Sequence, residues 1–327
     1  MLADAIPAPD RFRTGDETAP AMGEACLKNG NHFLELGRSE EGRPLFGAVL
    51  GRGPTRVSLV AGAHAEEPVG PETLRALVIH ADRLGAMLDR FTFVVVPHLN
   101  PDGEARNRGW MDAWPDAAAF ARHAVREPPG RDLEFGWPDL RRENVEAALF
   151  LKEHGPYAAH GSLHGMAFAE GAMLLLHRHW VSRTAELRKG FAAAVREAGL
   201  GLHDHDRGGE KGFWRIAPGF ATTPESGAMR DFFLARGDAD TASRFRMSSM
   251  EYARSLGGDP LCFVTEVPLW VVPNPEPRPG VPAAYLARKE RLARGEPPGD
   301  VRTVDVAAAA RLQLRVLDLV LRAVGAA

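Results

Sequence analysis

The chain has 327 residues, of which 45% are hydrophobic and 25% charged, and its formal net charge is −3. This composition is ordinary for a globular protein, and it excludes a disordered chain, a collagen-like fibre and a small scaffold stapled by disulfides. The arginines are scattered and form no basic stripe, so we expect no nucleic-acid partner.

Short, nearly continuous apolar segments alternate with helical patterns along the chain. The apolar segments predict buried strands at 57–62, 91–97, 172–177 and 261–267. Apolar residues repeat at helical spacing over 71–88, 139–154, 181–198 and 304–324. Strands that alternate with helices predict an α/β fold, a three-layer α/β/α architecture with a mixed, largely parallel central sheet.

Two stretches depart from this alternation. Segment 103–137 is polar and irregular, which predicts long loops of the kind that carry function. Six prolines between residues 268 and 282 predict a rigid connector, after which the C-terminal helix packs back on the protein. We therefore expect an N-terminal extension over 1–30 and a single domain over 31–327 that includes the connector 268–282.

The two cysteines bear on the cellular compartment. Cys26 and Cys262 are too few for a disulfide framework, which favours the reducing cytoplasm. The N-terminus lacks the charged and apolar regions of a signal peptide, and no run of 18 apolar residues predicts a transmembrane helix. We expect a cytoplasmic protein with no membrane partner.

His64 and Glu67 directly follow the first predicted strand. A neutral imidazole and a carboxylate suit Zn²⁺, and both can face one ion where a strand turns into a helix. The spacing alone is not selective, because His32 and His203 also stand three residues before an acidic residue. The context is more selective, because open α/β sheets bind ligands at the carboxyl ends of their strands.

A catalytic zinc has three protein ligands and one open position, so a third ligand should come from another strand end. His164 is the candidate and His160 the competitor. Glu266 is a lone carboxylate inside an apolar strand, where an unpaired charge is costly. It either forms an ion pair with an arginine or acts as a general base beside the metal.

Arginines follow the sequence NPDG, which occupies residues 100–103 and predicts a turn. Arg106 and Arg108 come first, and Arg141 and Arg142 stand at the start of a later helix. An arginine can polarise a carbonyl or hold a carboxylate through two hydrogen bonds. The histidine-rich loop at 203–206 is interpreted as a solvated loop rather than as a second metal site.

Taken in order, these segments resemble the zinc carboxypeptidase family, the carboxypeptidase A-like metallopeptidases. The matching segments are GRSEEGRPL at 37–45, AGAHAEE at 61–67, NPDG at 100–103, DLRR at 139–142, SLHG at 162–165, PESG at 224–227 and FVTE at 263–266. The resemblance implies the zinc carboxypeptidase fold and one Zn²⁺ per chain, held by His64, Glu67 and His164.

The resemblance also implies roles for other residues. Glu266 would be the general base that deprotonates the zinc-activated water and later passes the proton to the leaving amine. Arg106 or Arg108 would stabilise the oxyanion, Arg142 would hold the terminal carboxylate of the substrate, and Tyr252 would cap the site. The family's carboxylate clamp usually reads Asp-x-Asn-Arg-Asn, whereas residues 139–144 read DLRREN, a departure that favours a more anionic substrate.

Together these implications predict a zinc metallocarboxypeptidase that hydrolyses a C-terminal peptide or peptide-like amide bond of a substrate with a free carboxylate. A zinc-dependent deacylase of the aspartoacylase or succinylglutamate desuccinylase type is the alternative, because the sequence AHAEEPV at 63–69 resembles its opening motif. That enzyme would act on acyl-amino acids. A non-catalytic binding protein with the same fold is disfavoured by the intact ligand set and by Glu266.

Overall fold

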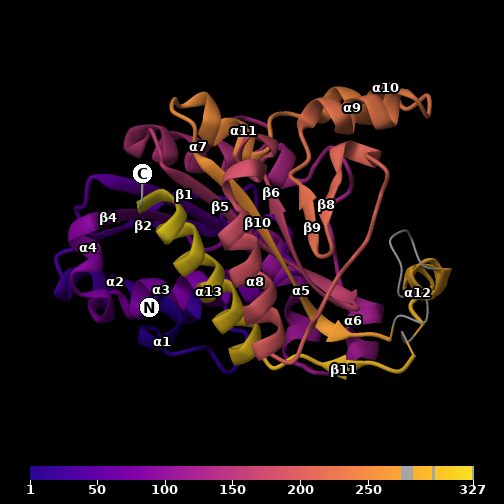
Figure 1. Ribbon diagram of the computed structural model, residues 1–327, viewed down its shortest axis with the longest axis horizontal. Coiled ribbons are helices and arrows are strands. Elements are labelled where there is room, and N and C mark those ends of the chain that lie inside the picture. Colours follow the sequence, from indigo (N-terminus) through magenta and orange to yellow (C-terminus); the bar gives the residue numbers. More distant parts are fainter. Residues whose placement is uncertain (274–282, 297–298, 326–327) are drawn as a thin grey trace.

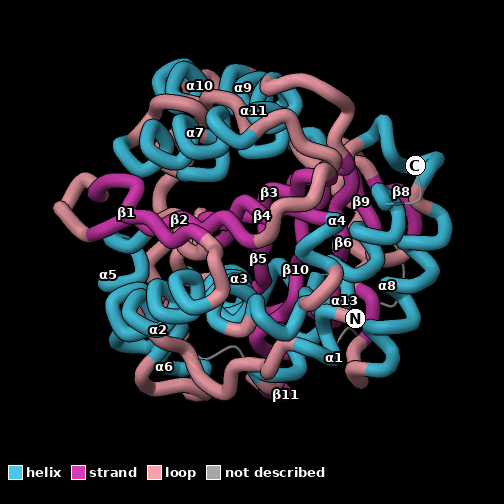
Figure 2. The backbone as a smooth tube through the Cα atoms, turned by 90° about the vertical axis from the view of Figure 1, so that its left-hand side faces the viewer, coloured by secondary structure: helices cyan, strands magenta, loops and turns pink. Residues whose placement is uncertain are grey.

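A mixed sheet runs through the centre of the molecule in the computed structural model, which describes residues 1–273, 283–296 and 299–325 (Figures 1 and 2). In spatial order its strands are β1 (His32–Arg38), β2 (Pro44–Leu50), β4 (Phe91–Val96), β3 (Thr55–Ala61), β5 (Ala159–Ala169), β10 (Leu261–Val271), β6 (Gly171–Leu176), β9 (Phe220–Thr222) and β8 (Arg215–Ala217). Two short strands, β7 (Gly201–Leu202) and β11 (Arg302–Thr303), pair with β6 and β10. The four central strands β4, β3, β5 and β10 are parallel.

Helices cover both faces of the sheet, as Figure 2 shows. One face carries α1 (Leu2–Ala5), α2 (Gly15–Lys28), α3 (Val69–Ile79), α8 (Ala185–Glu197) and α13 (Val306–Gly325). The opposite face carries α7 (Arg142–His154), α9 (Ser226–Leu234), α10 (Ala239–Arg244) and α11 (Ser249–Ser255). The remaining α-helices are α4 (Met87–Arg90), α5 (Pro101–Met111), α6 (Ala117–His123) and α12 (Ala283–Ala293). Among the described residues, none of the helices combines the length and the apolar character needed to cross a membrane.

The apolar strands owe their sequence to burial on both faces. In β4, Phe93 and Val95 belong to the larger core cluster under α3 and α13, whereas Val94 and Val96 belong to the cluster under α7. Side chains of a strand alternate between the two faces of the sheet, so a strand covered on both sides is apolar throughout. The predicted three-layer α/β/α fold with its mixed, largely parallel sheet is confirmed.

Several local predictions need correction. The helix predicted over 71–88 is divided: α3 ends at Ile79, a 3₁₀ turn follows over Ala81–Leu84, and Gly85, with a positive φ of 51°, separates this turn from α4. The region 103–137 is not a continuous loop, since α5 and α6 occupy most of it up to His123. Strand β5 was not predicted, because small and polar residues interrupt the first seven positions of its sequence, AHGSLHGMAFA, and only the last four are uninterrupted apolar residues.

The ends of the expected domain also differ from expectation. Pro268 does not open a connector but lies inside β10, at a position where β6 has stopped pairing with that strand. Residues 269–271 of the expected connector also belong to β10, and residues 274–282 lie outside the described residues. The N-terminal extension expected over 1–30 packs on the same core, where the backbone N–H groups of Leu2 and Ala3 donate to the Asp318 carboxylate of α13.

Candidate active site

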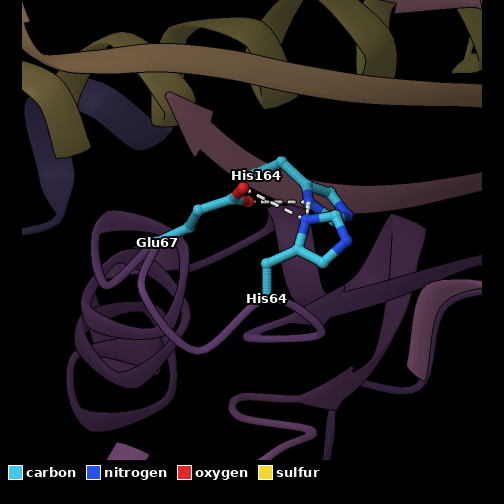
Figure 3. A group of neighbouring side chains, drawn as sticks. All are labelled: His64, Glu67 and His164. Atoms are coloured by element: carbon cyan, nitrogen blue, oxygen red, sulfur yellow. Dashed lines mark hydrogen bonds and ion pairs between the residues drawn. The ribbon is translucent and has the colours of Figure 1, made fainter. Parts of the chain in front are cut away.

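Three side chains converge at the carboxyl end of β3 and the middle of β5, as Figure 3 shows. One potential ligand atom from each of His64, Glu67 and His164 lies within 4.8 Å of the others. The Glu67 carboxylate places Oε1 3.1 Å from Nδ1 of His64 and Oε2 2.8 Å from Nδ1 of His164. The two Nδ1 atoms themselves are 2.9 Å apart. Among the described residues this is the one group of its kind.

Two glycines allow the segments to approach closely. Gly62 follows β3 with a positive φ of 70°, and a Cβ there would lie 2.9 Å from the His98 ring. Gly70 opens α3, and a Cβ there would lie 2.2 Å from the backbone oxygen of Leu163. Because α3 therefore sits directly against β5, Glu67 also accepts a hydrogen bond from the backbone N–H of Gly165. The turn between β3 and α3 and strand β5 are thus brought together by backbone contacts as well as by the ligands.

Two further carboxylates face the outer nitrogens of the histidines. Asp132 Oδ2 is 2.9 Å from Nε2 of His64, and Glu134 Oε2 is 3.1 Å from Nε2 of His164. A histidine that donates its Nε2–H to a carboxylate keeps a lone pair on Nδ1, the atom that points to the centre of the group. Burial of Asp132 opposes the ionisation of its carboxyl, but the neighbouring His64 lowers the pKa of that carboxyl to about 2. Both carboxylates therefore orient the histidines for metal binding.

The donor set fits a zinc ion. Two neutral imidazole nitrogens that face each other at 2.9 Å repel unless a cation or a proton lies between them. Imidazole nitrogen and carboxylate oxygen are ligands that zinc prefers, at about 2.0–2.2 Å each. Ligand atoms at these distances from one tetrahedral ion lie less than 4.8 Å from one another, as the three ligand atoms do here. His64, Glu67 and His164 would hold the ion, and three protein ligands leave one position open.

Glu266 lies beside this group. It is the register partner of His164 on the adjacent parallel strand β10, so both side chains stand on the same face of the sheet. Burial, and then the charge of Glu67, raise the pKa of the Glu266 carboxyl to about 8. The structure places no arginine in an ion pair with it, among the residues described, so the ion-pair alternative is not supported.

One cavity of about 860 Å³ joins the three ligands to Glu266. Its polar lining includes Glu66, Arg126, Glu127, Asp132 and Glu134. Its apolar lining is extensive and includes Phe120, Phe135, Met166, Phe168, Met173, Leu175, Phe213, Met229, Phe233, Phe245, Met250, Val264, Leu286 and Leu292. A cavity of this size with a few convergent polar groups is typical of a ligand-binding site.

Arg126 is the arginine that reaches the ligands, and the sequence analysis missed it. Its guanidinium is 2.7 Å from Glu66, 3.1 Å from Glu67 and 3.1 Å from both ring nitrogens of His64. Arg106 instead pairs with Glu41 and Glu127. Arg108 pairs with Asp112 and Glu17, and neither it nor Arg106 lines the cavity.

The expected carboxylate clamp is likewise placed elsewhere. Arg142 is exposed at the start of α7 and does not line the cavity. Arg141 is buried, where it pairs with Glu143 at 2.7 Å, with Glu127 at 3.2 Å and with Glu40 at 3.3 Å. The aspartate that reaches a ligand histidine is Asp132, in the sequence DLEFG over 132–136. At the Asn and Arg positions of the Asp-x-Asn-Arg-Asn pattern, this sequence carries Glu134 and Phe135, and both line the cavity.

Three other sequence candidates lie outside the metal group. Tyr252 is buried against Trp137, donates to the backbone oxygen of Ala148 at 2.8 Å and does not line the cavity. His160 faces Ser58 at 2.8 Å within the core, where burial lowers its pKa to about 4. His203 of the histidine-rich loop is hydrogen-bonded to Glu170 and lines the cavity without belonging to the metal group.

Asp132, Glu134 and Arg126 were missed because they lie in an irregular segment, between α6 and α7, that carries no periodic pattern. One signal was available. The acidic residues of the sequence RDLEF at 131–135 alternate with apolar ones in a segment expected to be a loop, and loops often carry function.

Comparisons with known proteins agree with this geometry. A family model described as zinc carboxypeptidase matches residues 28–158. A curated relative, zinc carboxypeptidase A 1 of Anopheles gambiae, is 32% identical over 123 residues, which are 34% of this chain and 28% of the relative. The chain thus spans little more than a quarter of that relative's length.

Solved structures extend the likeness over nearly the whole chain. Carboxypeptidase A of Helicoverpa armigera superposes with a TM-score of 0.57 at 14% identity, covering 97% of this chain and 75% of that one. A metallo-carboxypeptidase of Burkholderia cenocepacia gives a TM-score of 0.54 at 17% identity, covering 96% and 70%. The protein is therefore similar to the zinc carboxypeptidases, in sequence over residues 28–158 and in fold over nearly its whole length.

Proposed function

We propose that this protein is a zinc-dependent hydrolase of the metallocarboxypeptidase kind, which cleaves an amide bond of a peptide or peptide-like substrate. The observation that carries the proposal is the placement of Glu266 next to His164, in the same cavity as His64 and Glu67. A metal-ligand set beside a general base is the arrangement that metal-assisted amide hydrolysis requires.

When bound at this group, zinc would lower the pKa of a water molecule and polarise a carbonyl. Glu266 would accept the proton of the attacking water at its carboxylate and return it to the leaving nitrogen. Burial and the charge of Glu67 raise its pKa, and the charge of a bound cation would lower it again, so the carboxylate could take up a proton and give it back. Asp132 and Glu134 would hold the two histidines in the required tautomer and orientation.

Arg126 would stabilise the negative charge that develops on the carbonyl oxygen. Its guanidinium is half-exposed in the cavity and lies within 3.1 Å of both His64 and Glu67, so it sits at the edge of the metal group. Donors held at such a position are worth about two to three powers of ten in rate. In this proposal Arg126 takes the role that the family resemblance implied for Arg106 or Arg108.

The cavity favours a peptide over a small acyl-amino acid. Its volume of about 860 Å³ and its many aromatic and methionine side chains exceed what an acetyl or succinyl amino acid would fill. The deacylase alternative is therefore the second candidate and enters the experiment as a substrate class. We also propose that the protein works in the cytoplasm, which is supported by two free, buried cysteines, Cys26 and Cys262, whose burial raises their thiol pKa values to about 11 and 12.

The experiment is metal analysis of the purified protein combined with a hydrolysis panel of peptides and acyl-amino acids, with and without chelator. We expect about one zinc per chain and peptide cleavage that chelator abolishes and zinc restores. Glu266→Gln should keep the zinc and lose the cleavage. Zinc with turnover of acyl-amino acids alone would favour the deacylase, and absence of both zinc and turnover would refute the proposal.

A further inference from the structure

The cavity extends well beyond the metal group along strand β5. His164, Met166 and Phe168 are alternate residues of this strand, and all three line the cavity. At about 3.3 Å per strand residue, His164 and Phe168 are about 13 Å apart along the strand. The cavity is therefore long enough for about four residues of an extended peptide.

Helix α12 contributes to the wall of this cavity with Leu286, Arg288 and Leu292. It packs against α6, whose Phe120 also lines the cavity (Figure 1). Arg288 feels the charge of Glu170. Glu170 directly follows β5 and is six residues beyond His164 in the sequence. Arg288 thus belongs to the end of the cavity remote from Glu266.

Arg288 differs from the other arginines of the cavity. Its Nε and Nη1 atoms are buried and have no hydrogen-bond partner among the described residues. Arg126 pairs with Glu66 at 2.7 Å and Arg207 with Glu210 at 2.9 Å. The Glu170 carboxylate is hydrogen-bonded to His203 and forms no ion pair with Arg288 in the described part of the chain.

A guanidinium with buried, unpaired N–H groups costs free energy until an anion satisfies it. A carboxylate is the natural partner, because it can accept two parallel hydrogen bonds from the planar guanidinium. We propose that Arg288 is a specificity residue that binds a carboxylate of the substrate at the end of the cavity remote from Glu266. This inference rests on the proposed function, which supplies the substrate that lies along β5.

Two sources can supply this carboxylate. An acidic side chain several residues from the cleaved bond would reach Arg288 while the bond itself lies beside Glu266. Alternatively, the terminal carboxylate of the substrate lies there, and the enzyme then releases a short peptide rather than a single amino acid. Both sources share the same chemistry, and the position of cleavage distinguishes them.

The test uses zinc-loaded protein carrying Glu266→Gln, so that peptides bind without being cleaved. The probes are N-acetylated hexapeptides of alanine and phenylalanine with either a free or an amidated C-terminus, and with glutamate or glutamine at each position in turn. Their dissociation constants are measured by calorimetry with Arg288 intact, with Arg288→Ala and with Arg288→Lys. Arg291→Ala is the matched control, because Arg291 lies on the same helix, pairs with Glu296 and does not line the cavity.

We expect Arg288→Ala to weaken binding of the carboxylate-bearing peptides by about 10- to 100-fold, the value of a charge-assisted hydrogen bond. Peptides without a carboxylate should bind equally to both proteins, Arg288→Lys should give an intermediate loss, and Arg291→Ala should have no effect. A loss confined to free C-termini or to one glutamate position identifies the source. The inference would be overturned if the Arg288→Ala protein bound every peptide as tightly as the protein with Arg288 intact. It would also be overturned if Arg291→Ala weakened binding as much as Arg288→Ala.

Hydrolysis by the wild-type protein is measured in parallel on the same peptides, with the products identified by mass spectrometry. It tests the proposed function separately. If the wild-type protein cleaves none of the peptides, the hydrolase proposal is refuted. If the wild-type protein cleaves them and Arg288→Ala leaves peptide binding unchanged, only the role of Arg288 is refuted. Thermal unfolding of each variant shows whether a loss of binding comes from a loss of fold.

Discussion

Replacing Glu134 by alanine should weaken zinc binding without touching a ligand. Glu134 Oε2 accepts from Ser162 Oγ at 2.8 Å and faces Nε2 of His164 at 3.1 Å. Its Oε1 accepts from the backbone N–H and the hydroxyl of Ser249, at 3.1 and 2.5 Å. The carboxylate is thus clamped from both sides and holds the histidine in the tautomer that leaves Nδ1 free for the metal.

The expected magnitude follows from the bond that is lost. A hydrogen bond between a carboxylate and an imidazole N–H is worth about 1.5–3 kcal/mol, and about 1.4 kcal/mol is tenfold in a dissociation constant. Water can replace part of the lost interaction, so we expect zinc to bind about 10- to 100-fold more weakly, as is typical for the outer partners of metal ligands. Burial opposes the ionisation of Glu134, but the hydrogen bond to His164 lowers the pKa of its carboxyl, so the group is charged at neutral pH.

The assay is competition for zinc against a chromophoric chelator at pH 7.5, with thermal unfolding of the metal-free protein as a control for the fold. Glu210→Ala is the matched variant, because Glu210 also lines the cavity but pairs with Arg207 and contacts neither histidine. Glu134→Asp serves if the alanine variant does not fold. A zinc affinity within threefold of the wild type in a folded Glu134→Ala protein would refute the reasoning.

Three further predictions follow from single contacts. Glu266→Gln should retain zinc, measured by metal analysis, while kcat falls by about 10²- to 10⁴-fold, the usual contribution of a general base; full activity would exclude that role. Tyr252→Phe should leave kcat/KM within about twofold, because its hydroxyl bonds Ala148 in the core, and should lower the free energy of unfolding by about 1 kcal/mol; a tenfold loss of activity would place Tyr252 at the site. His160 stays neutral in the fold because burial lowers its pKa from 6.5 to about 4, so the unfolded chain takes up a proton first as the pH falls. From pH 7.5 to 5 this should destabilise the metal-free protein by about 2 kcal/mol in urea unfolding, a loss that His160→Gln should remove; an unchanged pH dependence in that variant would contradict it.

The sequence by itself determined the parts of the site that follow strands. His64 and Glu67 could be placed because an apolar strand ends just before them and a helix starts just after them. Glu266 could be placed because a carboxylate in an apolar strand is conspicuous. The alternation of apolar strands and amphipathic helices likewise predicted the three layers, because burial on both faces of a parallel sheet leaves a local pattern in the sequence.

Only the tertiary structure decided which residues complete the site. The pairing of β5 with β10 sets Glu266 beside His164, although 102 positions separate them and polar residues interrupt the first part of β5. Asp132, Glu134 and Arg126 reach the ligands from an irregular segment, whose path depends on packing against several other elements rather than on a local period. The same packing buries Tyr252, which the family resemblance had placed at the site. Spacing along the chain reports contacts within a helix or a strand, whereas the partners of a loop are set by the fold around it.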